Sequence, residues 1–360
     1  MPPTAPAPAP RRAAPARATI ADVAAQAGVS KATVSRFLNG RTELLTPDIA
    51  ERVRAAIAEL HYHPSPMAQA LKHGRSRLIG LVVADVTNPF SVAVLQGAEK
   101  ACQAAGYLLV LFNLGNEPGR EREALQAVQA YQLDGLILNR VDTNVQLWQP
   151  ATEHGKPIVL VDRFQAGLDA DFVSVDNAAI VHLALEHLLA NGFGELLLVS
   201  EPTEGVSSRA ERRTSFEAAQ ADQPAPGRWR GDYWESPGNE PADVARLAER
   251  LRQLVDQGRA RGAMPAVLAS NAIATLRVAT AAQHAGLALG RDLGFVGIDE
   301  TDWAGLIGPG LTTIAQPTDA LGQAAARCLI ERLHGLQEPA RTLALPGTLI
   351  ARGSSQPLKP

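Results

Sequence analysis

The sequence has few cysteines, few aromatic residues and no long hydrophobic run. Two cysteines, Cys102 and Cys328, among 360 residues exclude a disulfide framework and a cysteine-rich zinc site, and they suggest buried side chains in a reducing compartment. The longest apolar runs, such as 78–84, have the length of a strand and fall far short of the roughly 18 residues of a membrane span. With 46% hydrophobic and 20% charged residues, the composition is that of a globular cytoplasmic protein with no membrane contact.

The net charge of −3 hides an uneven distribution along the chain. Residues 1–77 hold 11 Lys and Arg against 5 Asp and Glu, whereas residues 78–360 hold 23 against 32. A basic N-terminal part on an acidic body indicates that the N-terminal part meets a polyanion. Charge alone would favour a solvated cluster, so the prediction of a nucleic acid partner depends on the motifs in this part.

Four segments follow one another along the chain. Residues 1–18 consist almost wholly of Pro, Ala and Arg, which cannot build a core, so a disordered tail is expected. No apolar stretch follows the arginines, which argues against a secretory signal. Residues 19–63 are expected to form a small helical domain, 64–76 a hinge, and 77–360 an α/β domain.

Residues 19–63 carry signals typical of a helix-turn-helix unit. Thr19, Ser30 and Thr46 stand where their side chains can cap three short helices, and Gly28 permits the turn between the first two. The second helix of such a unit lies in the major groove of double-stranded DNA. The alternative is a three-helix packing module with solvated arginines.

The outward face of the second helix offers groups that suit DNA. Arg36 can bond guanine O6 and N7, and Lys31 can reach guanine or phosphate. Neighbouring hydroxyl and amide groups suit phosphate contacts, which set the register on the duplex. The predicted DNA-contacting residues of this domain are Thr19, Ser30, Lys31, Ala32, Thr33, Ser35, Arg36 and Asn39.

The hinge, 64–76, contains a helix-start signal at Ser65-Pro66. The helix that could follow, 66–72, has too few residues to be stable alone in water. We therefore expect this segment to become helical only when another element orders it.

From residue 77 onward, apolar runs of strand length alternate with helical patterns, which predicts parallel sheets with helices on both faces. The length of this region predicts two α/β lobes. The expected strands are 78–84, 107–112, 135–138, 158–161, 172–175, 195–200, 266–270 and 294–298. The expected helices are 92–105, 120–132, 178–190, 242–255 and 272–285.

Loops at the carboxyl ends of parallel strands converge, so a cleft for a small polar ligand is expected between the lobes. Arginines are frequent near these strand ends. Because a guanidinium group pairs well with a carboxylate, they favour a sugar acid over a neutral sugar. These arginines are Arg140, Arg163, Arg209, Arg212 and Arg213.

Residues 19–40, which read TIADVAAQAGVSKATVSRFLNG, closely resemble the DNA-binding head of the LacI (lactose repressor) family. Residues 61–72 resemble that family's hinge, and 79–90 resemble the start of its effector domain. The resemblance implies a homodimer on a pseudo-palindromic operator, with paired hinge helices in the minor groove. It also implies a body similar to periplasmic sugar-binding proteins.

Leu71 stands where this family has an apolar wedge that unstacks a base step in the minor groove. The alternative is an ordinary linker leucine. Pro66 departs from the family, which often has a polar or basic residue there, but it suits the first position of a helix.

The resemblance also selects effector contacts. Asp162, Arg209, Asn271, Asp299 and Gln316 match positions where family members hydrogen-bond their effectors, and Phe90, Trp303 and either Tyr233 or Trp234 could stack on a sugar ring. The predicted effector-binding set is Phe90, Arg140, Asp162, Arg163, Arg209, Asn271, Asp299, Trp303 and Gln316.

Stretches 201–213, 299–303 and 307–317 look like the ketogluconate-utilisation repressors of this family. The expected effector is therefore a sugar acid such as a ketogluconate, and a neutral sugar or a corepressor mode is the alternative. Ala272 stands where the family usually has Asp, which leaves a less negative pocket that suits an anion. No C-terminal heptad tail follows residue 340, which favours a dimer over a tetramer.

Enzyme motifs are missing from the sequence. It has no P-loop, no GxGxxG after the first strand and no Gly-x-Ser-x-Gly elbow, and His182 and His187 are five residues apart, off the spacing of a helical metal pair. We therefore expect neither an enzyme nor a cofactor or metal site. The rival is a secreted sugar-binding protein, which the body alone would fit but the basic helical head does not.

Overall fold

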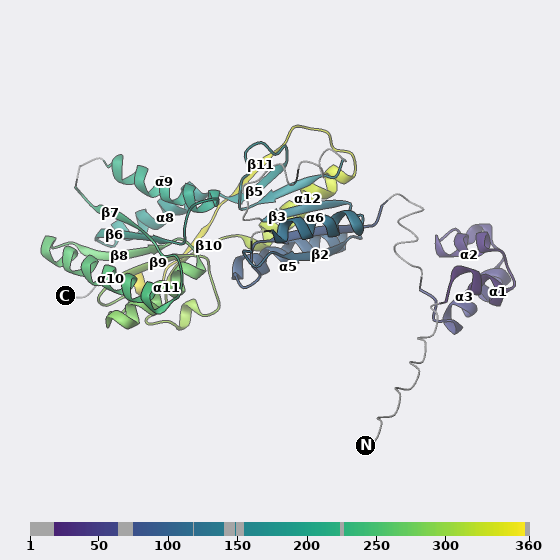
Figure 1. The fold of residues 1–360 in the computed structure, drawn as a ribbon, viewed down its shortest axis with the longest axis horizontal. Helices are drawn as coiled ribbons and strands as arrows, with labels where there is room; N and C mark the ends of the chain where they lie inside the picture. Colours follow the sequence, from purple (N-terminus) through teal and green to yellow (C-terminus); the bar gives the residue numbers. More distant parts are fainter. Residues whose placement is uncertain are drawn as a thin grey trace, which may run out of the picture. The chain divides into compact units, whose positions relative to one another are not determined.

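The computed structural model describes residues 18–63, 75–117, 119–139, 148, 155–223 and 227–356. The chain divides into two compact units, Met1–Ser76 and Arg77–Pro360, which are called the head and the body below (Figure 1). Most of the predicted tail and hinge, including Leu71, and the predicted effector residue Arg140 lie outside the described residues.

The head contains three short α-helices around a small apolar core. Thr19, Ser30 and Thr46 cap them as the sequence predicts, because each side chain accepts a hydrogen bond from the backbone N–H three residues later. Gly28 ends the first helix with a φ of +65°, a conformation that glycine adopts without steric cost. The helices are α1 (Ile20–Ala27), α2 (Lys31–Leu38) and α3 (Pro47–Glu59), with a 3-10 turn η1 (Thr42–Leu44) before α3.

Lobe 1 of the body is a parallel six-stranded sheet in the order β11-β5-β4-β3-β1-β2. Its helices α5 and α12 pack on one face and α6 on the other. Its strands are β1 (Leu78–Val83), β2 (Leu108–Asn113), β3 (Gly135–Asn139), β4 (Ile158–Val161), β5 (Asp171–Val175) and β11 (Thr342–Leu345). Its helices are α5 (Pro89–Ala104), α6 (Arg120–Ala130) and α12 (Thr318–Leu333).

Lobe 2 is a second six-stranded sheet, in the order β12-β10-β9-β8-β6-β7. Helices α8 and α9 cover one face, and α10 and α11 cover the other. Its strands are β6 (Phe193–Ser200), β7 (Arg230–Glu235), β8 (Met264–Ala269), β9 (Gly294–Ile298), β10 (Thr312–Ala315) and β12 (Thr348–Ile350). Its helices are α8 (Asn177–Ala190), α9 (Ser207–Ala221), α10 (Pro241–Arg261) and α11 (Ala272–Ala285), with 3-10 turns η3 (Ala304–Leu306) and η4 (Gly353–Ser355).

The chain passes between the lobes three times, at 175–177, 315–318 and 345–348. After β10 it returns to lobe 1 as α12, which is held tightly against α5. A Cβ added at Gly97 or Gly322 would come within 2.1 Å of the facing backbone, so only glycine allows these helices to approach this closely. The lobes are thus compact units joined by short connections (Figure 1).

The predicted α/β architecture of two lobes is confirmed, with two differences. The strand β12 runs antiparallel to β10, so the second sheet is not wholly parallel. The edge strand β7 and the short strands β10, β11 and β12 were not predicted, nor was α12. No helix in the described part of the chain is long and apolar enough to cross a membrane.

Candidate DNA-reading helix and effector cleft

The outer face of α2 carries the predicted base-reading residues. Lys31, Ala32 and Arg36 are exposed, because Val34 on the opposite face is fully buried in the head core. An exposed face that carries two cations, Lys31 and Arg36, is available to DNA.

The predicted phosphate-contacting residues near α2 also hold its ends in place. The Ser30 hydroxyl lies 2.9 Å from the Thr33 hydroxyl and accepts a bond from the Thr33 N–H. The Asn39 amide donates to the Ser35 carbonyl oxygen at 2.6 Å. Thr19 bonds to Asp22 in a capping box ahead of α1. These bonds fix Ser30, Thr33 and Asn39 relative to α2 and Thr19 relative to α1.

A cleft in the body collects seven of the nine predicted effector residues. Lobe 1 contributes the turn before α5 and the residues after β4, and lobe 2 contributes the start of α9 and the residues after β8, β9 and β10. The free volume is about 20 Å³, room for about one water molecule. The lining residues are Asn88, Phe90, Asp162, Arg163, Val206, Ser208, Arg209, Arg212, Asn271, Asp299 and Gln316.

Two buried carboxylates occupy equivalent positions, one after a strand of each lobe. Asp162 follows β4 and Asp299 follows β9, with φ angles of +65° and +81°, in a region that is unfavourable for residues other than glycine. Each backbone N–H donates to the neighbouring strand, from Asp162 to the Val173 oxygen at 2.9 Å and from Asp299 to the Ile314 oxygen at 3.0 Å. The strand pairing thus holds both carboxylates at the cleft despite the unfavourable φ.

Arg212 connects the polar groups of the cleft on the lobe 2 side. It donates to Asn177 Oδ1 at 2.8 Å, the Ser270 carbonyl oxygen at 2.6 Å and Gln316 Oε1 at 3.3 Å. The Gln316 amide in turn donates to Asp299 Oδ1 at 2.5 Å. Burial raises the pKa of the Asp299 carboxyl, and the charge of Arg212 opposes this shift. Burial also lowers the pKa of the Arg212 guanidinium.

Arg212, counted above among the arginines near the strand ends, lines the cleft although it is absent from the predicted effector-binding set. The signal available in the sequence was its position three residues after Arg209, which places both arginines on one side of a helix. Arg163, from the loop after β4, is buried beside Asp162 with 3.8 Å between Nε and Oδ2, and burial lowers the pKa of its guanidinium.

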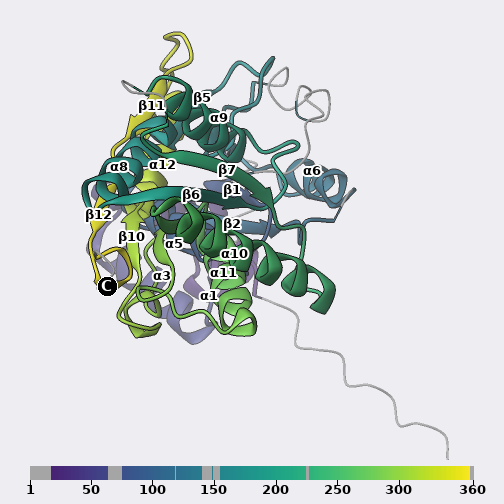
Figure 2. The ribbon, with the colours of Figure 1, turned by 90° about the vertical axis from the view of Figure 1, so that its left-hand side faces the viewer.

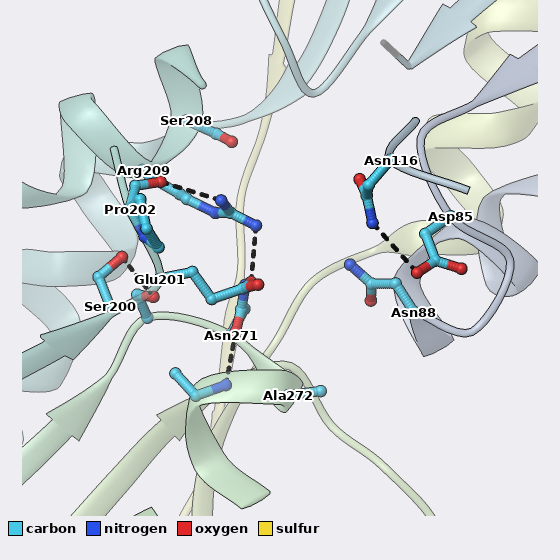
Figure 3. Close-up of polar contacts among 12 residues, drawn as sticks. Asp85, Asn88, Asn116, Ser200, Glu201, Pro202, Ser208, Arg209, Asn271 and Ala272 are labelled. Atoms are coloured by element: carbon cyan, nitrogen blue, oxygen red, sulfur yellow. Dashed lines mark hydrogen bonds and ion pairs between the residues drawn. The ribbon is translucent and has the colours of Figure 1, made fainter. Parts of the chain in front are cut away.

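Glu201, the first residue after β6, was not predicted as functional but lies at the centre of a charged cluster. Its Oε2 accepts a bond from Arg209 at 2.6 Å and from the Asn271 amide at 2.8 Å. Its Oε1 lies 3.8 Å from Arg277 on α11. Figure 3 shows Arg209 and Asn271 converging on the Glu201 side chain.

Polar residues of lobe 1 face this cluster from the other side of the view in Figure 3. Asn116 donates to Asp85 Oδ2 at 3.1 Å. Asn88 caps α5 by accepting a bond from the Phe90 N–H at 3.1 Å. Asn116, on the loop after β2, is a polar strand-end residue that the sequence reasoning did not select.

Trp303, a predicted effector residue, is partly buried against the apolar core of lobe 2 and is not among the described residues that line the cleft. Trp234 packs against the same core, and the Tyr233 ring holds Arg213 at 4.2 Å from its centroid. Arg213 also pairs with Glu217. Among the described residues, Phe90 is the aromatic side chain that lines the cleft.

Ala272 joins the cleft through its backbone, because its N–H donates to Asp299 Oδ2 at 2.9 Å. Within the described ranges, no group of three or more His, Cys, Asp or Glu side chains is arranged to hold a metal ion.

A helix-turn-helix head together with a two-lobed, cleft-bearing body defines the class of DNA-binding regulators with a ligand-binding domain. The family model for bacterial regulatory proteins of the lacI family matches residues 19–65, and a model for a periplasmic binding protein-like domain matches residues 185–355.

Curated relatives agree over nearly the whole chain. The sequence is 45% identical over 340 residues to the HTH-type transcriptional regulator PtxS of Pseudomonas plecoglossicida. This alignment covers 94% of this chain and 96% of the relative. It is 37% identical over 336 residues to the HTH-type transcriptional regulator KdgR of Bacillus subtilis strain 168. That alignment covers 93% of this chain and 97% of the relative.

Among solved structures, the lac repressor dimer bound to operator and the anti-inducer ONPF is similar, with a TM-score of 0.78, 25% identity and coverage of 94% of this chain and 99% of that one. A complex of the transcriptional regulator CelR with cellobiose gives a TM-score of 0.65 at 25% identity, with coverage of 94% and 100%. The chain belongs to the LacI family and is a DNA-binding transcriptional repressor rather than an enzyme.

Proposed function

We propose that the protein is a homodimeric repressor whose operator binding is controlled by an anionic sugar derivative, such as a ketogluconate, bound in the cleft. The observation that carries this proposal is the cluster of three arginines, Arg163, Arg209 and Arg212, in the cleft lining. Guanidinium groups bind a carboxylate through paired, charge-assisted hydrogen bonds. The carboxylates Asp162 and Asp299 are suited to accept bonds from sugar hydroxyls.

In this proposal α2 enters the major groove, where Arg36 and Lys31 contact bases and the polar groups around them contact phosphates. The segments keep the limits that the sequence suggests, with a reading head at 19–63, a hinge at 64–76 and an effector-binding and dimerisation domain at 77–360. Leu71 of the hinge is proposed to enter the minor groove. A protein that acts on operator DNA in this way works in the cytoplasm.

Exposed apolar side chains support the dimer. Leu108 and Leu111 lie on the edge strand β2, and the Leu108 side chain is 67% exposed. In lobe 2, Leu276 lies on α11 and Leu306 on η3, and Leu306 is 83% exposed. In Figures 1 and 2, β2 and α11 lie toward the lower side of the body. Exposed apolar surface on a sheet edge of lobe 1 and on a helix of lobe 2 suits a self-complementary contact with a second copy.

The effector acts only if it binds the operator-bound and released states with different affinity. The cleft in this structure leaves about 20 Å³, far less than a sugar acid requires. Ligand entry therefore requires the lobes to move apart about the connections at 175–177, 315–318 and 345–348. A shift between lobes alters the relative positions of β2 and α11, which carry the proposed dimer contacts.

A neutral sugar is the second candidate, and the two hydroxyl-accepting carboxylates favour it. Calorimetric titration of the full chain with 2-ketogluconate, gluconate and glucose separates the candidates. We expect binding of a sugar acid and reduced affinity for a duplex operator selected from a random-sequence pool. Binding of glucose without binding of either acid would contradict the proposal, and tighter operator binding with ligand would show a corepressor.

A further inference from the structure

The Glu201 carboxylate lies where a carboxylate from outside would have to bind. Two donors of the cleft lining, Arg209 and Asn271, both point to Glu201 Oε2 at 2.6 and 2.8 Å. They belong to the α9 start and to the α11 cap, and Glu201 follows β6. The Glu201 side chain is thus already bonded to the two groups that are proposed to bind the effector carboxylate (Figure 3).

Glu201 adds a negative charge directly beside an arginine of the described cleft lining. The three arginines of the lining face the carboxylates of Asp162 and Asp299, which leaves one positive charge in excess. Glu201 offsets the charge of Arg209, to which it is bonded, and Arg277 lies on the other side of Glu201. The Glu201 and Arg209 side chains are only 13% and 15% exposed, so water screens their interaction weakly. An anionic ligand therefore has to compete with Glu201 for Arg209.

A second partner for Glu201 is already in place. Arg277 on α11 lies 3.8 Å from Glu201 Oε1, and its guanidinium is held by Asn239 Oδ1 at 3.0 Å and by the Ser236 carbonyl oxygen. Its side chain is buried, which lowers the pKa of the guanidinium, and Glu201 opposes this shift. A small rotation of the Glu201 side chain would bring its carboxylate closer to Arg277, and a closer carboxylate stabilises the charged guanidinium.

We propose that Glu201 is an exchangeable internal counter-ion, which the effector carboxylate replaces at Arg209 and Asn271 while Glu201 moves to Arg277. This inference rests on the proposed sugar-acid effector and deepens it, because it names the residue that sets the preference for an anion. The exchange moves a charge from the cleft to α11, next to the exposed Leu276 of the proposed dimer surface. A neutral sugar cannot drive it, since it brings no charge to replace Glu201.

The test compares Glu201→Gln with Glu204→Gln in the full chain by calorimetric titration with 2-ketogluconate, gluconate and glucose. Glu204 lies on the same loop and is exposed, so its variant matches the change in charge without touching the cluster. In the Glu201→Gln variant, the new amide oxygen still accepts bonds from Arg209 and Asn271 but carries no charge. We expect this variant to bind the sugar acid about tenfold more tightly than wild type does. Its glucose affinity, and every affinity of the Glu204→Gln variant, should stay within about twofold of wild type.

Arg277→Gln provides a second variant with the opposite sign. It removes the cation that receives Glu201, so sugar-acid affinity should fall while glucose affinity stays unchanged. General structural damage would instead lower the affinity for every ligand in both variants. Unchanged or weaker acid binding by Glu201→Gln overturns the exchange while leaving the proposed function intact, provided wild type binds the acid. If neither wild type nor Glu201→Gln binds any sugar acid, the proposed function is lost and the exchange with it.

Discussion

The DNA-reading face of the head and the cleft of the body organise charge in opposite ways. On α2, Lys31 and Arg36 are exposed and lie within one eight-residue helix. In the cleft, Arg212 is buried and bonded to groups that come from α8, from the residue after β8 and from the segment after β10. The head presents exposed charged side chains to a partner. The body instead bonds its charged side chains to other groups of the protein, and these bonds must rearrange before a ligand can bind.

The largest effect should come from removing the most connected charge of the cleft. Arg212→Met leaves Asn177, the Ser270 carbonyl and Gln316 without their donor, and because each buried acceptor left unsatisfied costs about 1–3 kcal/mol, the three together cost about 3 kcal/mol or more. We expect a loss of this size in the free energy of unfolding, measured by urea denaturation. The control Arg213→Met, on the same helix but at the surface, should change it by less than about 0.5 kcal/mol; a similar small loss for Arg212→Met would contradict the account.

Arg209→Ala should separate effector binding from DNA binding. Removing the guanidinium proposed to hold the effector carboxylate should weaken 2-ketogluconate binding by about 2–3 kcal/mol. Operator affinity without ligand should stay at the wild-type value, because α2 is not altered. Unchanged ligand affinity in calorimetry would remove Arg209 from the effector site.

The reciprocal change lies in the head. Arg36→Ala should weaken binding to a selected operator by about 1–3 kcal/mol and relax the preference at one base pair. Effector affinity should not change. An equal loss on random duplex DNA, measured by fluorescence anisotropy, would show that Arg36 contacts only phosphate.

The smallest effect should be confined to the stability of the head. Thr46 caps α3 by accepting a bond from the Ile49 N–H, so Thr46→Ala should destabilise the head by about 1 kcal/mol, whereas Thr46→Ser should retain the cap. Hydrogen exchange of the α3 amides measures this effect. Faster exchange in the body helices as well would contradict an effect that is confined to the head.

Local signals explain what the sequence predicted well. The caps at Thr19, Ser30 and Thr46 depend on residues within one turn of the chain, and the strands β4 and β9 are continuous apolar runs buried on both faces. The strand β7 was missed because its sequence RGDYWE is polar and it lies at a sheet edge. Pairing with β6 makes it a strand, and that pairing is not visible in the local sequence.

The sequence predicted which residues lie at the cleft, but not which of them bond to one another. The carboxyl ends of strands located Asp162, Asn271 and Asp299, because parallel strands bring such ends together. The role of Glu201 depends on Asn271, which lies 70 residues away in the chain. Trp303 lies in the same loop after β9 as Asp299, but its ring is partly buried against the apolar core of lobe 2.

The most direct test of effector control is an anisotropy titration of labelled operator with the full chain, in wild type and Arg209→Ala, as 2-ketogluconate is added. The account predicts that wild type releases the operator over the concentration range in which calorimetry shows ligand binding, and that Arg209→Ala stays bound. Operator binding that does not respond to the sugar acid in wild type, or equal release by both proteins, would contradict it.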